Sequence, residues 1–304
     1  MKIRAILNPR AGLAAARARD ALLDGPWPDL DLIETRAQGH ARDLAHEAAD
    51  AGCDVVLAAG GDGTANEVAW GLLGSPVALG LVPVGSGNGL ARSLGIPLDA
   101  GAAVRSLAGA VVRPMDVGFA NDRPFLNVSG AGLDALVGAD FQAHGQQGGR
   151  RGILTYVRLS VPRALRYRAP HWTLRAGDFG FEGRALIVAF VNGRQYGGGA
   201  VIAPRARLDD GLLDVVVFED ASLAEVMLNA PRMFLGTIER FRRYRHFHTT
   251  SALLEGPAPF LHHRDGEPEP EGARLELRLE PRALRVLVPR AVADDPAGPF
   301  GPVP

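Results

Sequence analysis

The sequence predicts a two-domain protein, with an N-terminal α/β domain built on a parallel sheet and a β-rich, sandwich-like C-terminal domain. Strand and helix patterns alternate over residues 2–94, as expected for a parallel sheet covered by helices on both faces. Short strand patterns separated by turn residues dominate from residue 115 onward. The length agrees, because 304 residues are too many for one small domain and enough for two.

In the first domain we expect strands at residues 2–7, 30–34, 55–59 and 77–82, each followed by a helix. Turns rich in glycine or asparagine follow three of these strands, at Asn8, Asp62 and Ser86. Open parallel sheets bind ligands at the carboxyl ends of their strands. We therefore expect these three turns to converge on one site.

The turn at residues 60–63 holds three glycines and one carboxylate, Asp62. Thr64 and Glu67 follow with capping-box spacing, so a helix is predicted to begin at this point. Its first turn would offer unpaired N–H groups to an anion. A carboxylate is unfavourable beside a bound anion unless it accepts a proton or holds a metal, which makes Asp62 a candidate for chemistry.

The second domain is predicted to hold short strands and two helical passages. The strands are expected at residues 116–119, 125–129, 171–175, 185–192, 201–203, 213–218, 275–279 and 283–288. The helices are expected at 154–168 and 223–247, and the second would place His246 and His248 on the surface. The residues after 290, rich in proline and glycine, are predicted to be a flexible tail.

Composition narrows the function classes. Hydrophobic residues make up 47% and charged residues 22%, and the net charge of -1 gives no reason to expect nucleic acid as a partner. The single cysteine, Cys53, rules out an internal disulfide and is compatible with a reducing compartment. No signal peptide or membrane-spanning segment is expected. No Gly-Lys pair exists, so a nucleotide would not be held by a Walker-type P-loop.

Five segments, in order along the chain, resemble the diacylglycerol kinase and sphingosine kinase superfamily of lipid kinases. They are residues 6–12 (Ile-Leu-Asn-Pro-Arg-Ala-Gly), 60–68 (Gly-Gly-Asp-Gly-Thr-Ala-Asn-Glu-Val), 83–91 (Pro-Val-Gly-Ser-Gly-Asn-Gly-Leu-Ala), 209–214 (Asp-Asp-Gly-Leu-Leu-Asp) and 265–267 (Asp-Gly-Glu). The resemblance implies transfer of the γ-phosphoryl group of ATP to a lipid hydroxyl, with Mg²⁺. It also implies an ATP-binding domain at 1–114 with a returning strand at 283–290, a lipid-substrate domain at 115–282 across a cleft, and a tail at 291–304.

The same resemblance assigns roles to residues of this sequence. The nucleotide-binding set is Asn8, Pro9, Thr35, Gly60, Gly61, Asp62, Gly63, Thr64, Glu67, Gly85, Ser86, Gly87 and Asn88. The general base is Asp62 by similarity to sphingosine kinases, or Asp265 or Glu267 by similarity to bacterial diacylglycerol kinases. The sequence does not choose between these two assignments of the base. Asp134 corresponds to a polar contact near the lipid head group.

Two positions bear on metal and substrate. Asp210 matches the acidic residue of a structural Mg²⁺ site, with the backbone carbonyls of Arg207 and Leu212 as further ligands. Gly89 stands where bacterial diacylglycerol kinases usually carry an aspartate. This departure favours a sphingoid base or ceramide over diacylglycerol as the lipid substrate.

A basic amphipathic segment indicates a membrane surface as a transient partner. Residues 141–177 contain arginines and interleaved apolar residues but no acidic residue. We therefore expect a cytoplasmic, peripherally membrane-associated enzyme. A homodimer is compatible with the sequence. The rival interpretations are an NAD kinase, since that related group shares the Gly-Gly-Asp-Gly turn, and a catalytically silent nucleotide- or lipid-binding protein.

Overall fold

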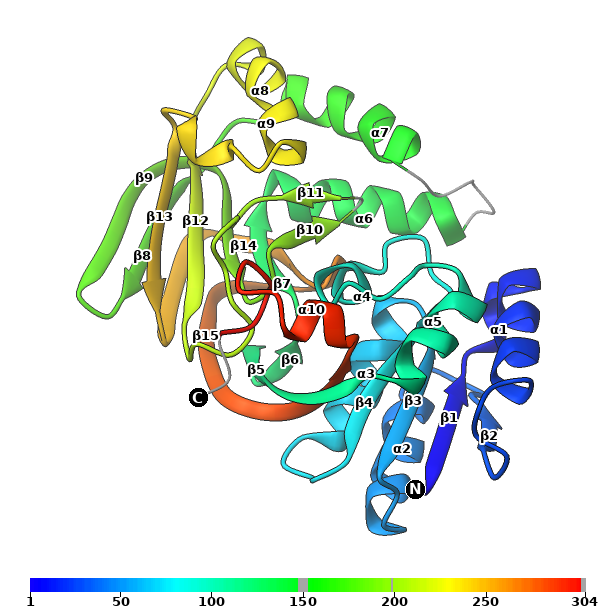
Figure 1. The fold of residues 1–304 in the computed structure, drawn as a ribbon. Helices are drawn as coiled ribbons and strands as arrows, with labels where there is room; N and C mark the ends of the chain where they lie inside the picture. Colours follow the sequence, from blue (N-terminus) through cyan, green and yellow to red (C-terminus); the bar gives the residue numbers. More distant parts are fainter. Residues whose placement is uncertain (147–152, 198, 302–304) are drawn as a thin grey trace. The chain divides into compact units, whose positions relative to one another are not determined.

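The computed structural model describes residues 1–146, 153–197 and 199–301 (Figure 1). The chain divides into two compact units. Unit 1 comprises residues 1–117, 208–210 and 281–301, and unit 2 comprises residues 118–207 and 211–280 apart from the undescribed positions. The sequence placed the corresponding boundaries after residues 114 and 282.

Unit 1 contains a parallel sheet with the strand order β2-β1-β3-β4, seen side by side in Figure 1. Its elements are β1 (Ile3–Leu7), η1 (Pro9–Ala11), α1 (Leu13–Leu23), β2 (Asp31–Glu34), α2 (His40–Asp50), β3 (Val55–Gly60), α3 (Asp62–Leu72), β4 (Ala78–Pro83), α4 (Gly89–Ser93), α5 (Ala100–Ala108) and α10 (Arg290–Ala293). Every residue of β3 and β4 is buried, as expected for strands covered on both faces.

Two strands belong to both units. They are β5 (Val111–Ala120) and β15 (Glu267–Val288). The last part of β15 pairs in parallel with β4, with Arg285 opposite Ala78 and Val286 opposite Leu79. The sequence predicted two strands interrupted near residue 281, whereas the structure has one strand with a positive φ of 53° at Arg282.

The helices of unit 1 pack in pairs, α2 on α3 and α1 on α5. Gly71 of α3 allows the first pair to approach closely, because a Cβ there would collide with the carbonyl oxygen of Arg42. Asp99 caps α5 by accepting a hydrogen bond from the N–H of Ala102 at 2.9 Å.

Residues 291–301 pack on unit 1, so the prediction of a flexible tail was wrong for this part; residues 302–304 lie outside the described chain. Phe300 is 1% exposed and lies beneath the guanidinium of Arg113, 5.1 Å from ring centroid to Cζ. The same guanidinium donates to the carbonyl of Gly301 at 2.6 Å. The proline- and glycine-rich composition predicted flexibility, but the single aromatic side chain of this segment, Phe300, holds it against unit 1.

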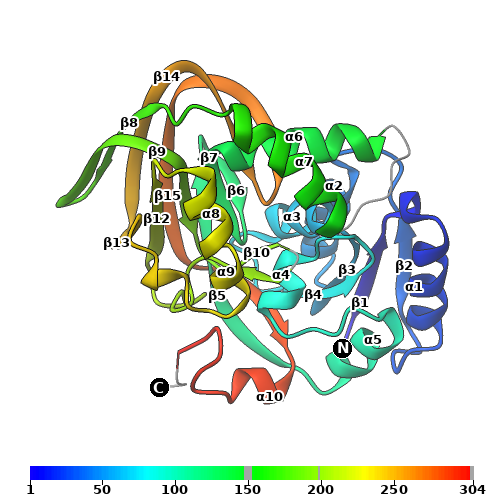
Figure 2. The same ribbon diagram turned by 90° about the horizontal axis from the view of Figure 1, so that it is seen from above.

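Unit 2 is mostly antiparallel. Its further elements are β6 (Arg123–Phe125), β7 (Val128–Gly132), α6 (Leu133–Gln146), α7 (Ile153–Arg166), β8 (His171–Ala176), β9 (Phe179–Val191), β10 (Gln195–Gly197), β11 (Ala200–Val201), β12 (Leu213–Glu219), α8 (Leu223–Asn229), α9 (Pro231–Phe234), η2 (Ile238–Arg240), β13 (Tyr244–Thr249) and β14 (Ser251–Arg264). The long strands β9 and β14 each pair with both β7 and β8, so these four strands form a closed ring. Figure 2 shows the curvature of β14 that this double pairing requires.

The ring encloses an apolar core. Trp172, 1% exposed, belongs to this core. Its ring is edge-on to Phe260 at 5.0 Å between centroids, and its indole N–H donates to the carbonyl of Ala185 at 3.1 Å. A second apolar cluster, which includes Val216, Phe218 and Tyr244, lies on the other face of β12 and β13. Successive residues of a strand point to opposite faces, which is how β12 serves both clusters.

The predicted helix at residues 223–247 is the largest error in the second domain. Only α8, α9 and the short η2 are helical, and the last residues form the edge strand β13. Pro231 cannot donate to the preceding turn of helix, and Gly236 takes a positive φ of 63°, so a single helix cannot continue. The alternation of Tyr244, His246 and His248 is a strand pattern that the basic composition obscured.

Within the described residues, no helix is both long and apolar enough to cross a membrane.

Candidate nucleotide and acceptor sites

The three glycine- and asparagine-rich turns of unit 1 lie next to one another. In the register of the sheet Leu7 is opposite Ala59, and Gly60 is opposite Pro83, so β1, β3 and β4 end at the same level. The N–H of Asn8 donates to the carbonyl of Ala59 at 2.9 Å. Adjacent parallel strands thus bring together segments that are far apart in the sequence.

Asp62 connects the second turn to the third. It is the first residue of α3, and its two carboxylate oxygens accept hydrogen bonds from the N–H groups of Asn88 (2.8 Å) and Gly89 (2.7 Å). Asn88 has a left-handed φ of 53°, and its side chain closes the third turn on Gly85 with bonds of 3.1 and 2.7 Å. The aspartate that seemed unfavourable in the sequence therefore occupies the N-terminus of α4, where a carboxylate is stabilised.

The glycines of these turns permit the close approach. A Cβ on Gly85 would lie 2.7 Å from the Cα of Gly61, and a Cβ on Gly87 would lie 2.7 Å from a carboxylate oxygen of Asp62. A Cβ on Gly60 would collide with the side chain of Thr64. These positions need glycine for space rather than for a special φ.

Two neighbouring side chains complete the first turn. The amide of Asn8 donates to the hydroxyl of Thr64 at 3.1 Å, and the amide oxygen of Asn8 accepts from the N–H of Arg10. Pro9 begins η1, where its fixed φ suits a helical first position. Thr35 follows β2, and its N–H donates to the carbonyl of Leu7 at 2.8 Å, so it lies beside the first turn.

The capping box predicted for Thr64 and Glu67 is wrong. The helix α3 begins three residues earlier than this capping box requires, with Gly61 instead of Thr64 as its N-cap and no side-chain cap. The carboxylate of Glu67 instead accepts from the N–H groups of Gly39 (2.9 Å) and Ala41 (3.2 Å) at the start of α2. Glu67 thus stabilises the N-terminus of a neighbouring helix, a contact that local spacing cannot reveal.

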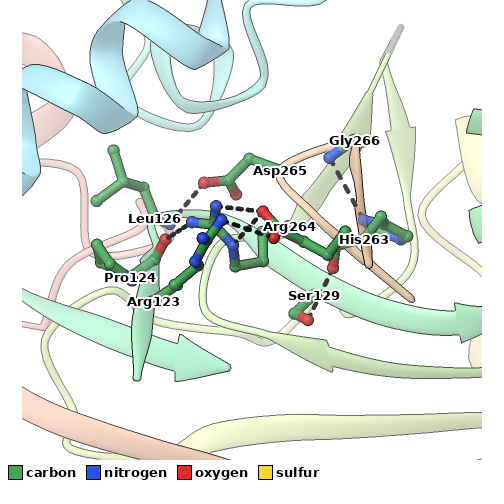
Figure 3. Close-up of polar contacts among 9 residues, drawn as sticks. Arg123, Pro124, Leu126, Ser129, His263, Arg264, Asp265 and Gly266 are labelled. Carbon is green, nitrogen blue, oxygen red and sulfur yellow. Dashed lines mark hydrogen bonds and ion pairs between the residues drawn. The ribbon is translucent and has the colours of Figure 1, made fainter. Parts of the chain in front are cut away.

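The acidic motif of unit 2 forms a tight turn between β14 and β15. Asp265 and Gly266 have positive φ values of 48° and 83°, the requirement of a two-residue hairpin turn of type I′. The Asp265 carboxylate accepts hydrogen bonds from the N–H groups of Leu126 (2.8 Å), Asn127 (2.8 Å) and Val128 (3.0 Å). Figure 3 shows Asp265 pointing toward Leu126. Asp265 therefore anchors the segment between β6 and β7 to the turn.

A buried ion pair supports the same turn. The guanidinium of Arg264 donates to the carbonyl of Pro124 at 2.6 Å (Figure 3). It also donates to the carboxylate of Glu269 at 2.7 Å, and Arg123 contacts the other oxygen of Glu269 at 3.0 Å. Glu267 differs from these residues because it is exposed. Of the two acidic residues in the motif, Glu267 is the more exposed.

Asp134 belongs to a buried polar group that the sequence did not predict. It lies in the first turn of α6, is 5% exposed, and forms a hydrogen bond with the hydroxyl of Tyr196. The Nε2 of His263 lies 3.0 Å from the same carboxylate oxygen, and its Nδ1 faces the N–H of Gly266 at 3.3 Å (Figure 3). Since Nδ1 accepts from Gly266, Nε2 carries the proton and donates to Asp134. This group links α6 to the acidic turn.

The predicted magnesium ligands do not fall in one unit. Asp210, which is exposed, belongs to unit 1, whereas Arg207 and Leu212 belong to unit 2. The neighbouring Asp209 forms an ion pair with Arg113 at 3.0 Å. The magnesium site stays a prediction.

Comparison with known proteins agrees with these features. Residues 2–120 match the diacylglycerol kinase catalytic domain, and residues 127–288 match the YegS C-terminal NAD kinase beta sandwich-like domain. A "Probable lipid kinase YegS-like" protein of Pseudomonas aeruginosa strain UCBPP-PA14 is 34% identical over 293 residues, covering 92% of this chain and 91% of the relative. The chain belongs to the YegS-like lipid kinase family. A second YegS-like relative, from Klebsiella pneumoniae strain 342, is 30% identical and covers 93% of this chain and 95% of its own.

Two solved structures share the fold of this YegS-like chain. A diacylglycerol kinase from Bacillus anthracis superposes with a TM-score of 0.75 at 24% identity, over 96% of this chain and 98% of its own. An NAD kinase from Archaeoglobus fulgidus in complex with ATP superposes with a TM-score of 0.53 at 12% identity, over 95% and 94%. Both likenesses concern the fold alone.

Two residues of the YegS-like chain's buried polar group, Tyr196 and His263, were missed in the sequence. His263 directly precedes Arg264 and the acidic motif, and this adjacency was the available signal. Tyr196 carried no signal, because β9 and β10 bring it to Asp134 only in the folded unit.

A pH-dependent stability follows from the neighbouring His262, which is 5% exposed. Burial lowers the pKa of His262 to about 4, against an opposing contribution from Glu269. The unfolded chain binds more protons between pH 6.5 and 4, so the stability of unit 2 is expected to fall as the pH decreases through this window. After allowance for solvent screening, His262 should account for about 2 kcal/mol of the loss.

Urea unfolding at pH 7 and pH 5 checks this expectation. His262→Gln should reduce the pH dependence, whereas His171→Gln, at an exposed position on β8 of the same unit, should leave it unchanged. Equal pH dependence in the wild type and His262→Gln would exclude His262 as its source.

Proposed function

We propose that this protein is an ATP-dependent lipid kinase, which transfers the γ-phosphoryl group to a lipid hydroxyl. The observation that carries the proposal is Asp62, placed where three strand ends meet and bonded to the N–H groups of Asn88 and Gly89. Membership of the YegS-like lipid kinase family supports it. Phosphoryl transfer depends mainly on positioning and on neutralising charge, and rigid turns rich in N–H groups provide both.

The contacts of Asp62 specify which N–H groups remain for phosphate. Those of Asn88 and Gly89 are occupied by the carboxylate, so we assign no phosphate to them, although the resemblance includes Asn88 in the nucleotide-binding set. The first N–H groups of an α-helix have no partner within the helix. We therefore assign the phosphates to the N–H groups of Gly63 and Thr64 at the start of α3, together with Ser86 and Gly87 of the third turn.

Magnesium fits the donors in this site. Hard oxygen ligands suit Mg²⁺, and the Asp62 carboxylate, which the N–H groups of Asn88 and Gly89 hold at the ends of β3 and β4, supplies oxygens of this kind. When bound with ATP, the ion would neutralise the phosphate charge. Asp210 with the carbonyls of Arg207 and Leu212 is proposed as a separate, structural Mg²⁺ site.

For the proton acceptor we favour Glu267 over Asp265. The Asp265 carboxylate accepts three backbone N–H groups and holds the turn, whereas Glu267 is exposed. Asp62 then positions the nucleotide turns and magnesium, and Glu267 accepts the hydroxyl proton. The group of Asp134, His263 and Tyr196 orients the turn and the lipid head group.

The lipid is proposed to be a sphingoid base, ceramide or diacylglycerol. The deciding experiment incubates the protein with ATP and Mg²⁺ over a panel of sphingosine, ceramide, diacylglycerol and monoacylglycerol. Phosphorylation of one of these lipids is expected. If Gly89 indicates a sphingoid-base or ceramide substrate, sphingosine or ceramide should be phosphorylated faster than diacylglycerol.

The alternatives predict other results. NAD kinase is a second candidate, because the ATP-bound NAD kinase of Archaeoglobus fulgidus shares the fold. Phosphorylation of NAD without any lipid product would favour it. Nucleotide binding with no phosphorylation of NAD or of any lipid would favour a silent binding protein.

Contact with an anionic membrane surface is proposed for α7 and its neighbours α8 and α9, which lie at the same edge of unit 2 in Figure 1. On α7, Leu165 is 66% exposed, with Arg158 and Arg166 also exposed. On α8 and after α9, Leu228 and Leu235 are 79% and 73% exposed. Apolar side chains beside arginines are the composition of interfacial segments.

The contribution of α7 can be tested on vesicles. Arg158→Glu/Arg166→Glu should weaken binding to anionic vesicles about tenfold at low salt and less at high salt. Arg163 is unsuitable, because it donates to Asp140 at 2.7 Å and this hydrogen bond, with the charge of the guanidinium, holds the pKa of the Asp140 carboxyl low. The matched control is Arg17→Glu, an exposed arginine on α1 of unit 1. Unchanged binding of the double variant would assign α7 a structural role.

A further inference from the structure

Two histidines and one aspartate of unit 2 meet on one face of β12 and β13. In the antiparallel register Asp214 is opposite His248, and Val216 is opposite His246. Directly opposite residues share a face of the sheet, and residues two apart on a strand share it too. The pairing therefore places all three polar side chains on the same face.

The ligand atoms of these side chains lie close together. One carboxylate oxygen of Asp214 is 2.6 Å from Nε2 of His246 and 3.3 Å from Nε2 of His248. The two rings are nearly perpendicular, at 80°, with centroids 4.8 Å apart. One ligand atom from each residue lies within 4.8 Å of the other two.

The apolar surroundings of Asp214 make a charged carboxylate energetically unfavourable at this position. Its side chain is 1% exposed, and its neighbours on the same face are the apolar cluster of Val216, Phe218 and Tyr244. Its second oxygen is buried and has no hydrogen-bond partner among the described residues. A buried carboxylate needs partners for both of its oxygens, and the two imidazoles contact only one of them.

The donor set indicates which metal ions would bind between these side chains. Two imidazole nitrogens with one carboxylate oxygen suit Zn²⁺, Fe²⁺, Co²⁺ or Ni²⁺, and Mg²⁺ and Ca²⁺ prefer oxygen ligands. Around a tetrahedral zinc ion, neighbouring ligand atoms lie about 3.4 Å apart, which a small opening of the His246–Asp214 contact would provide. His248 is 48% exposed, so an ion can reach the site and retain water or an exogenous ligand.

We propose that Asp214, His246 and His248 form a binding site for a divalent transition-metal ion, with Zn²⁺ as the reference ion. It is distinct from the proposed Mg²⁺ sites of the nucleotide and of Asp210, because two of its three donors are imidazole nitrogens. The ion joins β12 to β13, the edge strand of the sheet. Zn²⁺ therefore stabilises unit 2 by adding a cross-link between these two strands to their backbone pairing.

Cobalt titration tests the site directly. Tag-free full-length protein is treated with a chelator, dialysed and titrated with Co²⁺, and the visible absorption of the ion is recorded. One Co²⁺ per chain with the absorption of a nitrogen- and oxygen-coordinated ion of low coordination number is expected. Zn²⁺ should displace it, and a large excess of Mg²⁺ should not. Zn²⁺ should also raise the melting temperature by several degrees.

Variants decide which residues are responsible. His248→Ala removes the most exposed ligand and should weaken binding at least tenfold, and His246→Gln/His248→Ala should abolish both the cobalt spectrum and the thermal shift. His46→Ala is the control, because His46 forms the exposed pair with Asp50 at 3.2 Å on α2 and should leave both signals unchanged. No binding by the wild type, or equal binding by the double variant, would overturn the proposal, as would loss of binding in His46→Ala.

Discussion

Asp62→Asn is expected to lower the turnover of lipid phosphorylation at least about 100-fold while unit 1 stays folded. The carboxylate accepts N–H groups from both Asn88 and Gly89. An asparagine presents an NH₂ group to one of them, which replaces a hydrogen bond by a contact between two donors. The third turn should move away from α3, and the charge proposed to organise magnesium is lost. Asp62→Ala should have at least the same effect.

Turnover, ATP affinity and melting temperature of the same preparation check this prediction. Asp20→Asn, at an exposed carboxylate on α1, is the control and should resemble the wild type. A variant that keeps its melting temperature within a few degrees and loses turnover assigns Asp62 to the mechanism. Near-normal turnover of Asp62→Asn would remove it.

Substitutions at Asp265 and Glu267 should affect different properties. The substitution of Asp265 should lower stability, and that of Glu267 should lower turnover. Asp265→Asn should destabilise unit 2 by roughly 2–4 kcal/mol, because the Asp265 carboxylate accepts three N–H groups. Glu267→Gln should change stability by less than about 0.5 kcal/mol, since the residue is exposed. Its turnover should nevertheless fall about 100- to 1000-fold if Glu267 accepts the hydroxyl proton.

Denaturant unfolding and turnover at saturating ATP separate the two roles. Glu182→Gln, at an exposed glutamate on β9, is the matched control for loss of charge in unit 2. Full turnover in Glu267→Gln would exclude it as the base. Unchanged stability in Asp265→Asn would contradict the anchoring role of that carboxylate.

Much of the arrangement of the three turns at Asn8, Asp62 and Ser86 could be predicted from the sequence. Parallel strands must end at a common edge, so turns at Asn8, Asp62 and Ser86 were expected to meet, and β1, β3 and β4 bring them together. The singular position of Asp62 was also visible, because a carboxylate is uncommon in a glycine turn that begins a helix. What local pattern could not supply was the partner of that carboxylate, which lies 26 and 27 residues away.

The errors share a cause. Thr64 and Glu67 have the spacing of a capping box, but Glu67 finds the N-terminus of α2 through helix packing. Residues 244–249 have the composition of a basic helix end, but pairing with β12 makes them a strand. In both cases a tertiary partner overrides a local preference.

By itself, the sequence determined the family, the α/β and β-rich halves and the glycine turns, because these depend on patterns within a few residues of one another. Only the tertiary structure decided what the acidic and histidine side chains contact. Asp265 holds a backbone segment, Asp134 meets His263 and Tyr196, and Asp214 meets two histidines of β13. The physical reason is that strand register pairs residues distant in the chain, and register is settled by which faces become buried together.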